Sequence, residues 1–180
     1  TLTPLQVALV ALHIQLSHGE LEFPFGVFVT LALLLVYLDW RPIVLAAGLF
    51  AVHHVMFDRL QAAGFGFYCL SEPNFGRILL HAGYVVIQTA LELVLVVSMA
   101  RTSRQGDELA ALVAQVNQTD GIALDVSGVA VSTPLAQSLQ STLQRMQSVV
   151  SSVQHSSLEI ESASIEIARG NQDLSSRTES

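Results

Sequence analysis

The residues most able to do chemistry in this chain are histidines that lie within apolar segments. His53 and His54 are adjacent in the run FAVHHVMF, whose other residues are all apolar. His81 lies in a second apolar run, and His13 and His18 lie at the end of a third. Neutral imidazole binds transition-metal ions and haem iron, and polar groups in such surroundings usually mark function. We therefore expect these five histidines to form a cofactor-binding or metal-binding site.

Haem b is the favoured ligand for these histidines. Three helical segments offer opposed histidine pairs, and two axial histidines from facing helices can hold a haem iron. Small residues beside the histidines would leave space for the porphyrin, or would simply allow close helix packing. These small residues are Ala46, Ala47, Gly48, Ala51, Ala82 and Gly83.

A copper or zinc ion is the compact alternative. Its ligands would be His53, His54, His81 and Glu22, with Met56 or Cys69 adding softness for Cu(I). Neighbours on a helix point about 100° apart, so one of the adjacent pair would ligate while the other hydrogen-bonds a group such as Glu22. Two metal-free alternatives remain: histidines that bind a small apolar or quinone-like molecule, and histidines that only form interhelical hydrogen bonds.

The elements that must position these residues are four apolar segments in residues 1–100. They are Pro4–His18, Phe25–Leu38, Ile43–Phe57 and Ile78–Ala100. The fourth is apolar around its full circumference and long enough to cross a hydrocarbon core of roughly 30 Å, whereas the others, at about 14 to 17 residues, are short. We predict an all-α fold in which a membrane-spanning helical bundle of about four spans occupies residues 1–100.

The rest of the chain is more polar and predicts a different architecture. Residues 101–133 read as a connector with a short amphipathic helix, ELAALVAQV, followed by turn residues. From Pro134, apolar residues recur at alternate steps of three and four, which predicts a coiled coil over residues 134–180 and therefore at least a homodimer. The seam is Ala136, Leu139, Leu143, Met146, Val150, Val153, Ser157, Ile160, Ser164, Ile167, Asn171 and Leu174.

The run IEIARGNQDLSSRTES, Ile165–Ser180, resembles the start of the signalling domain of methyl-accepting chemotaxis proteins. LHIQLSHGELEF, VYLDWRPIV, AVHHVMFDRL and GRILLHAGYVVIQTALE resemble the membrane sensor region of a subgroup of these receptors. Residues 101–150 are loosely similar to a HAMP connector. The resemblance implies a multi-pass receptor of the bacterial inner membrane with a cytoplasmic C-terminus. As a homodimer, it would control a histidine kinase through a coupling protein and a part of the protein that lies beyond Ser180.

The resemblance also fixes an orientation, and one residue departs from its pattern. With the C-terminus cytoplasmic, His81 lies roughly 6 Å below Arg77, and the adjacent pair roughly 8 to 9 Å below Arg59. All five membrane-region histidines then share one periplasmic layer. The related receptors carry a Glu-x-His-Phe motif after this first span, but Pro24 stands here where that histidine is expected.

Composition excludes several classes of function. The net charge is −7 and all eight basic residues are arginines, so no basic patch is available to follow phosphates and we expect no nucleic-acid partner. The chain has no phosphate-binding glycine loop and no His-Glu-x-x-His motif, which predicts that it is not an enzyme. Gln88 and Glu92 lie deeper in the fourth segment; we expect Glu92 to be protonated and hydrogen-bonded, or else to couple sensor to output.

Overall fold

The computed structural model describes residues 2–20, 22–118 and 121–178, which form two compact units. The first unit ends at Ser103 and the second begins at Arg104. The long helix α4, Phe75–Val116, contributes residues to both. The predicted, mostly helical fold is confirmed.

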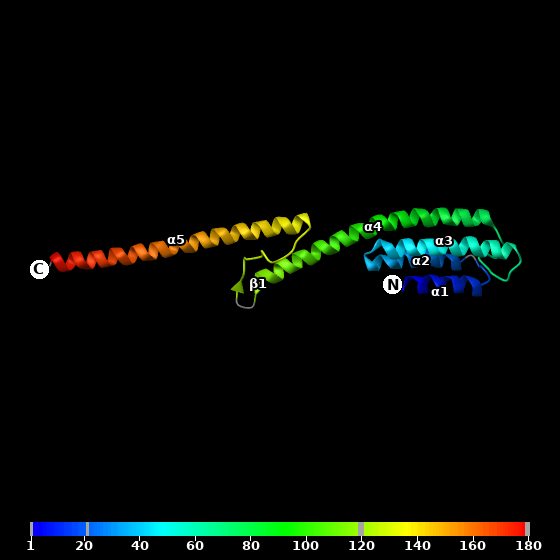
Figure 1. The fold of residues 1–180 in the computed structure, drawn as a ribbon, viewed down its shortest axis with the longest axis horizontal. Coiled ribbons are helices and arrows are strands. Elements are labelled where there is room, and N and C mark those ends of the chain that lie inside the picture. The colour runs from blue at the N-terminus through cyan, green and yellow to red at the C-terminus, as the bar shows by residue number, and fades with distance from the viewer. Residues whose placement is uncertain (1, 21, 119–120, 179–180) are drawn as a thin grey trace. The chain divides into compact units, whose positions relative to one another are not determined.

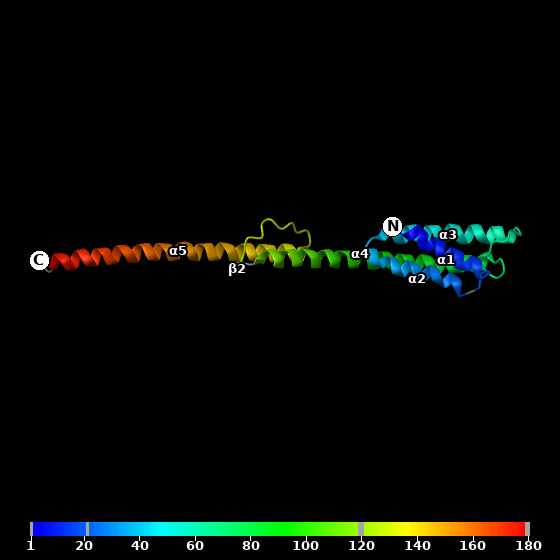
Figure 2. The ribbon, with the colours of Figure 1, turned by 90° about the horizontal axis from the view of Figure 1, so that it is seen from below.

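Four helical segments of the first unit run alternately in opposite directions (Figures 1 and 2). They are α1 (Thr3–Leu16), the consecutive η1 (Phe23–Phe25), α2 (Gly26–Leu33) and η2 (Leu34–Tyr37), then α3 (Trp40–Ala62), and the first part of α4. Helices α3 and α4 are long and apolar enough to cross a membrane. The two earlier segments are apolar but shorter.

The turn between η2 and α3 follows from local chemistry. Leu38 ends the preceding segment in the left-handed conformation, with φ of 51°. Asp39 then adopts an extended backbone, and its carboxylate accepts a hydrogen bond of 3.0 Å from the amide of Arg41. A side chain that caps a helix in this way satisfies an amide that the first turn leaves unpaired. Pro42 suits the same turn because it has no amide hydrogen to satisfy.

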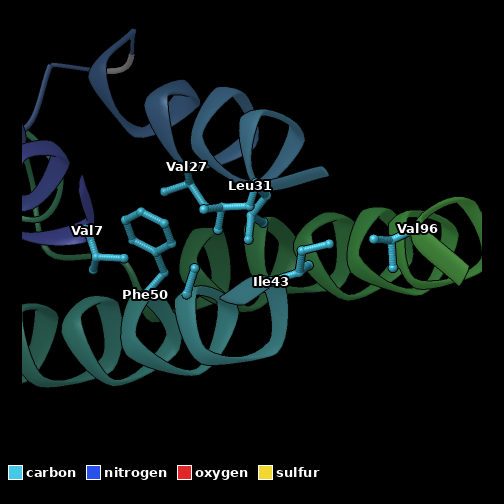
Figure 3. Close-up of a cluster of buried hydrophobic side chains, with 8 residues drawn as sticks. Val7, Val27, Leu31, Ile43, Phe50 and Val96 are labelled. Carbon is cyan, nitrogen blue, oxygen red and sulfur yellow. The ribbon is translucent and has the colours of Figure 1, made fainter. Parts of the chain in front are cut away.

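Apolar side chains from all four helical segments of the first unit meet in one cluster (Figure 3). Phe50 of α3 is 2 % exposed and lies close to Val7 of α1 and Val27 of α2. Ile43 and Val96 extend the cluster along α3 and α4. Although many large apolar side chains of this unit face outward, the cluster gives the segments a common interior.

Two glutamines hold the loop between α3 and α4 by its backbone. Gln15 of α1 donates to the carbonyl of Gly66 and accepts from the amide of Tyr68, both at 2.9 Å. Gln61 of α3 accepts from the amide of Cys69 at 3.0 Å and donates to the carbonyl of Leu70 at 2.7 Å. Each side-chain amide therefore pairs with the loop much as a neighbouring strand would.

The same loop packs against the turn that follows α1. Gly19 has φ of +76°, and a Cβ placed on it would lie 2.3 Å from the carbonyl carbon of Leu70. Cys69, next to Leu70, is fully buried. Burial, and to a lesser degree the negative charge of Asp58, raises the pKa of the Cys69 thiol to about 12. The thiol is therefore protected and protonated in the folded protein.

The second unit joins the end of α4 to α5 (Pro134–Thr178) through two short strands, β1 (Asn117–Gln118) and β2 (Gly121–Ile122), and an extended segment. Leu112 of α4 and Ala136 of α5 are fully buried together with Val126 of that segment. Two differences from the sequence predictions emerge. The expected short amphipathic helix is the last part of α4, because the polar residues before it contain no proline to end the helix. The paired strands were not predicted.

Glu108 of α4 binds the residues that precede α5. Its Oε1 accepts from the amide and hydroxyl of Ser132 at 3.0 and 2.5 Å, and its Oε2 from those of Thr133 at 2.8 and 2.6 Å. The hydrogen bond from the Ser132 hydroxyl, followed by those from Thr133, lowers the pKa of Glu108 to about 2. A carboxylate at the start of a helix also interacts favourably with the helix dipole. Glu108 thus fixes where α5 begins relative to the end of α4.

We expect this Glu108 contact to weaken at low pH. Because folding lowers the pKa, the contact contributes fully above the ordinary value of 4.5 and is lost as pH falls from there towards about 2. Hydrogen exchange at the amides of Ser132 and Thr133, corrected for the intrinsic rate, should lose protection over that range. Glu108→Gln should reduce protection already at pH 6, whereas Asp107→Asn at the exposed neighbouring position should not. Unchanged protection in Glu108→Gln would contradict this account.

Candidate functional site

Three of the predicted histidines meet where the end of α3 lies beside the start of α4. The His54 and His81 rings are nearly parallel, with centroids 5.3 Å apart and an interplanar angle of 12°. His53 lies edge-on to His54 at 5.2 Å. His53 and His54 are only 8 % and 5 % exposed, and His81 is half-buried. Adjacent residues on α3 and one residue of α4 thus form a compact imidazole cluster.

The hydrogen bonds of His54 assign its tautomer. Its Nδ1 lies 2.9 Å from the carbonyl oxygen of Phe50, one turn earlier in α3, and 3.4 Å from Nδ1 of His53. A carbonyl oxygen can only accept, so Nδ1 of His54 carries the hydrogen and its Nε2 carries a free lone pair. His53 then offers its Nδ1 as acceptor and carries its hydrogen on Nε2. A histidine that donates from one nitrogen to a backbone carbonyl has the usual orientation of a metal ligand or hydrogen-bond acceptor.

The Nε2 atoms of the three clustered histidines lack hydrogen-bond partners among the described residues. Nε2 of His53, His54 and His81 are all buried without a hydrogen-bond partner in the described part of the chain. A buried polar atom that lacks a partner costs free energy of about 1–3 kcal/mol. Three such atoms in one cluster call for an explanation, such as a bound water, an ion or an organic ligand.

A groove of about 370 Å³ runs from this cluster along α3 and α4. Its walls are mostly apolar, and its polar side chains are those of His54, His81 and Thr89. Thr89 also has a buried hydroxyl without a partner among the described residues. The small side chains Ala51 and Ala82 form an exposed rim, and the groove is open at this rim.

The other predicted ligands lie outside this cluster. His13 and His18 are exposed at the end of α1, where His13 contacts the ring of Phe23 and His18 the ring of Tyr68. Glu22 is exposed in the turn after α1. They lie in or after the last turn of α1 and are not among the residues that line the groove. Pro24, which replaces the expected histidine, is buried in η1.

The two soft ligands considered for Cu(I) are not among the residues that line the groove. Met56 is 48 % exposed on α3, and Cys69 is buried with Leu70 and Ile78 in a separate cluster. No group of three or more His, Cys, Asp or Glu side chains within residues 2–20, 22–118 and 121–178 is placed to hold a metal ion. An ion bound at His54 and His81 would therefore need further ligands from elsewhere.

The geometry also bears on haem. Axial histidines of a haem point at each other from opposite faces of the porphyrin. His54 and His81 instead stack side by side, with parallel rings at 5.3 Å. This pair does not provide the opposed arrangement that the haem prediction requires.

Aromatic rings connect the cluster to the surrounding elements. Phe67 of the α3–α4 loop contacts Phe57 at 5.1 Å, and Phe57 contacts His53 at 4.1 Å. At the other end, His81 lies edge-on to Phe28 of α2 at 5.0 Å. The sequence analysis did not predict these ring contacts, although the four-residue spacing of His53 and Phe57 on one helix is typical of side chains that meet.

A second polar contact lies deeper in the first unit. Nε2 of Gln88 on α4 donates to the carbonyl of Phe28 at 3.1 Å and to Oε1 of Glu92 at 2.6 Å. Glu92 is 4 % exposed, and its Oε2 has no partner among the described residues. The pair ties α4 to α2 and leaves one carboxyl oxygen unsatisfied within apolar surroundings.

Comparison of the chain with protein-family models, with curated proteins and with solved structures gave no match.

Proposed function

We propose that this chain is the sensing and relay part of a bacterial membrane receptor of the chemotaxis type. A ligand held at the histidine cluster would change how α4 packs against α3. The observation that carries the proposal is the cluster of His53, His54 and His81, whose Nε2 atoms are all buried without a partner among the described residues. His54 and His81 of this cluster also line an apolar groove. Intramembrane polar groups of this kind are expensive to keep and are functional by default.

Helix α4 is the element suited to the relay. Its residues from Ile78 to Leu93 line the groove, and the same helix extends to Glu108, which holds the start of α5. A ligand that favours one packing of α4 over another shifts the population of the two states. The exposed apolar stripe of α5, which includes Val150 and Val153, suits pairing with a second copy in a coiled coil.

The membrane arrangement belongs to the same proposal. All four helical segments of the first unit would lie in the inner membrane, the two shorter ones as thin or tilted spans. The turn after α1 and the α3–α4 loop would face the periplasm, and α5 the cytoplasm. Through a further part of the protein, the receptor would act on a histidine kinase and its coupling protein, as the resemblance of Ile165–Ser180 implies.

Disulfide cross-linking of the full chain in membranes tests the receptor proposal. We expect Val153→Cys copies to cross-link, and we expect His54→Ala to change that cross-linking rate by about fivefold or more, because allosteric coupling is typically worth 1–3 kcal/mol. His13→Ala, at an exposed histidine of the first unit that does not line the groove, is the matched control and should leave the rate unchanged. If the cross-linking rate is the same in the Val153→Cys chain, in the His54→Ala variant and in the control variant, the histidine cluster is not coupled to α5.

The same preparations report which ligand the cluster holds. Haem absorbance, or one copper or zinc ion per chain, that disappears in His54→Ala and His81→Ala but persists in His155→Ala would assign a haem or metal sensor. The protein could instead be colourless and metal-free while His54→Ala still changes the cross-linking rate. That result would exclude haem and a metal ion as the ligand and leave an organic molecule.

A further inference from the structure

The chemistry of the groove restricts its ligand more closely than the receptor proposal does. The wall is apolar apart from His54, His81 and Thr89. Ion sites rest on several convergent polar ligands, whereas this groove offers a long apolar surface with a polar end. The surface is therefore matched to an organic molecule that is mostly apolar.

His54, at the polar end of the groove, can form only one kind of hydrogen bond with a ligand. Nδ1 of His54 donates to the carbonyl of Phe50, so Nε2 of His54 can only accept. This atom belongs to a side chain that is 95 % buried (5 % exposed) and has no partner among the described residues. A ligand completes it by presenting a hydrogen-bond donor, and a ligand with only carbonyl oxygens would place acceptor against acceptor.

The open side of the groove determines how such a ligand arrives. The rim residues Ala51, Val55, Ala82 and Val86 are exposed on the two helices that are long and apolar enough to cross a membrane. In a bilayer this rim would face hydrocarbon and not water. A molecule that is dissolved in the membrane can therefore enter sideways between α3 and α4.

We propose that the α3–α4 groove binds a neutral, lipid-soluble molecule of the quinol class, whose hydroxyl donates a hydrogen bond to Nε2 of His54. This inference rests on the proposed function, because it names the ligand of the same histidine cluster. The apolar part of the molecule lies along Ala82 and Val86, and His81 stacks beside the ring that His54 holds. A quinol carries hydroxyls and the corresponding quinone does not, so occupancy of the groove follows the reduction state of the membrane pool.

Binding of three matched probes to the purified full chain in lipid nanodiscs tests this inference. The probes are decylubiquinol under reducing conditions, decylubiquinone, and the dimethyl ether of decylubiquinol, which keeps the shape but lacks both hydroxyls. We expect the quinol to bind about tenfold more tightly than either of the others, because these leave the His54 acceptor unsatisfied. Equal affinity for all three probes, or no binding of the quinol, would overturn the inference.

Three variants locate the site. His54→Met replaces the imidazole acceptor by a thioether sulfur, which accepts hydrogen bonds only weakly, and should remove most of the preference for the quinol. Ala82→Leu fills the exposed rim and leaves residue 54 as histidine, so it should reduce binding of all three probes even if His54→Met fails to fold. His155→Ala should bind as the unaltered chain does. Retained binding of every probe in Ala82→Leu would show that the groove is not the site.

Val153→Cys cross-linking in the same nanodiscs separates this inference from the receptor proposal. Selective binding of the quinol without any change in cross-linking would support the groove assignment and overturn the receptor function. Absence of quinol binding, together with a cross-linking rate that depends on a bound haem or metal ion, would overturn the groove assignment and support the receptor.

Discussion

Gly19→Ala is expected to destabilise the first unit by about 3 kcal/mol or more, since it adds a steric clash to a backbone penalty. Gly19 has φ of +76°, a conformation that costs other residues about 1–2 kcal/mol. Its new Cβ would also lie 2.3 Å from the carbonyl carbon of Leu70, so the loop backbone must move. Detergent-induced unfolding in mixed micelles measures the free energy of unfolding. Alkylation of Cys69 at pH 8, which burial suppresses in the unaltered chain, should become faster.

Gly64→Ala is the matched control for this prediction. Gly64 has a similar φ of +84°, but a Cβ placed on it meets no described atom within 4 Å. It should cost only about 1 kcal/mol, from the backbone alone. Cys69 should remain protected in Gly64→Ala. An equal loss of unfolding free energy in Gly19→Ala and Gly64→Ala would mean that the close approach of Gly19 to Leu70 does not add to the cost.

Gln88→Leu should destabilise the protein by about 2–3 kcal/mol, because it removes the partner of a buried carboxyl group. Gln88 donates to both Glu92 and the Phe28 carbonyl, and the variant leaves Glu92 without a hydrogen bond in apolar surroundings. The free energy of unfolding in mixed micelles again provides the measurement.

A double-mutant cycle separates the pair from its surroundings. Glu92→Leu alone should be nearly neutral, since replacing an incompletely satisfied carboxyl group by an apolar side chain removes its desolvation cost. Adding Glu92→Leu to Gln88→Leu should recover most of the lost stability. Additive losses in the double variant would show that Gln88 and Glu92 act independently.

The helices were predictable because their sequence signals are local. Four apolar segments separated by breakers, and a proline at the start of α5, placed the helices of both units. The continuity of α4 was missed because composition changes sharply after Ala100, while helix formation does not depend on hydrophobicity alone. The two-residue strands were missed because so short a ladder has no sequence period.

The histidine cluster was predictable only in part, because counting residues from a helix end fixes depth and not direction. His53, His54 and His81 share a depth and also face one another across α3 and α4. His13 and His18 instead contact Phe23 and Tyr68, and neither lines the groove. Direction depends on how each helix rotates in the bundle, and helices that are apolar on every side give no pattern from which to read it.

The way in which Gln15 and Gln61 bind the α3–α4 loop has a consequence for how the loop sequence can evolve. The side-chain hydrogen bonds that Gln15 and Gln61 form with this loop go to main-chain atoms of Gly66, Tyr68, Cys69 and Leu70. Most amino acids supply the same amide and carbonyl groups, so the outward-facing side chains of this loop are free to diverge among descendants while its path is preserved. The exposed surface of this loop can thus change from lineage to lineage without changes in the helices that hold it.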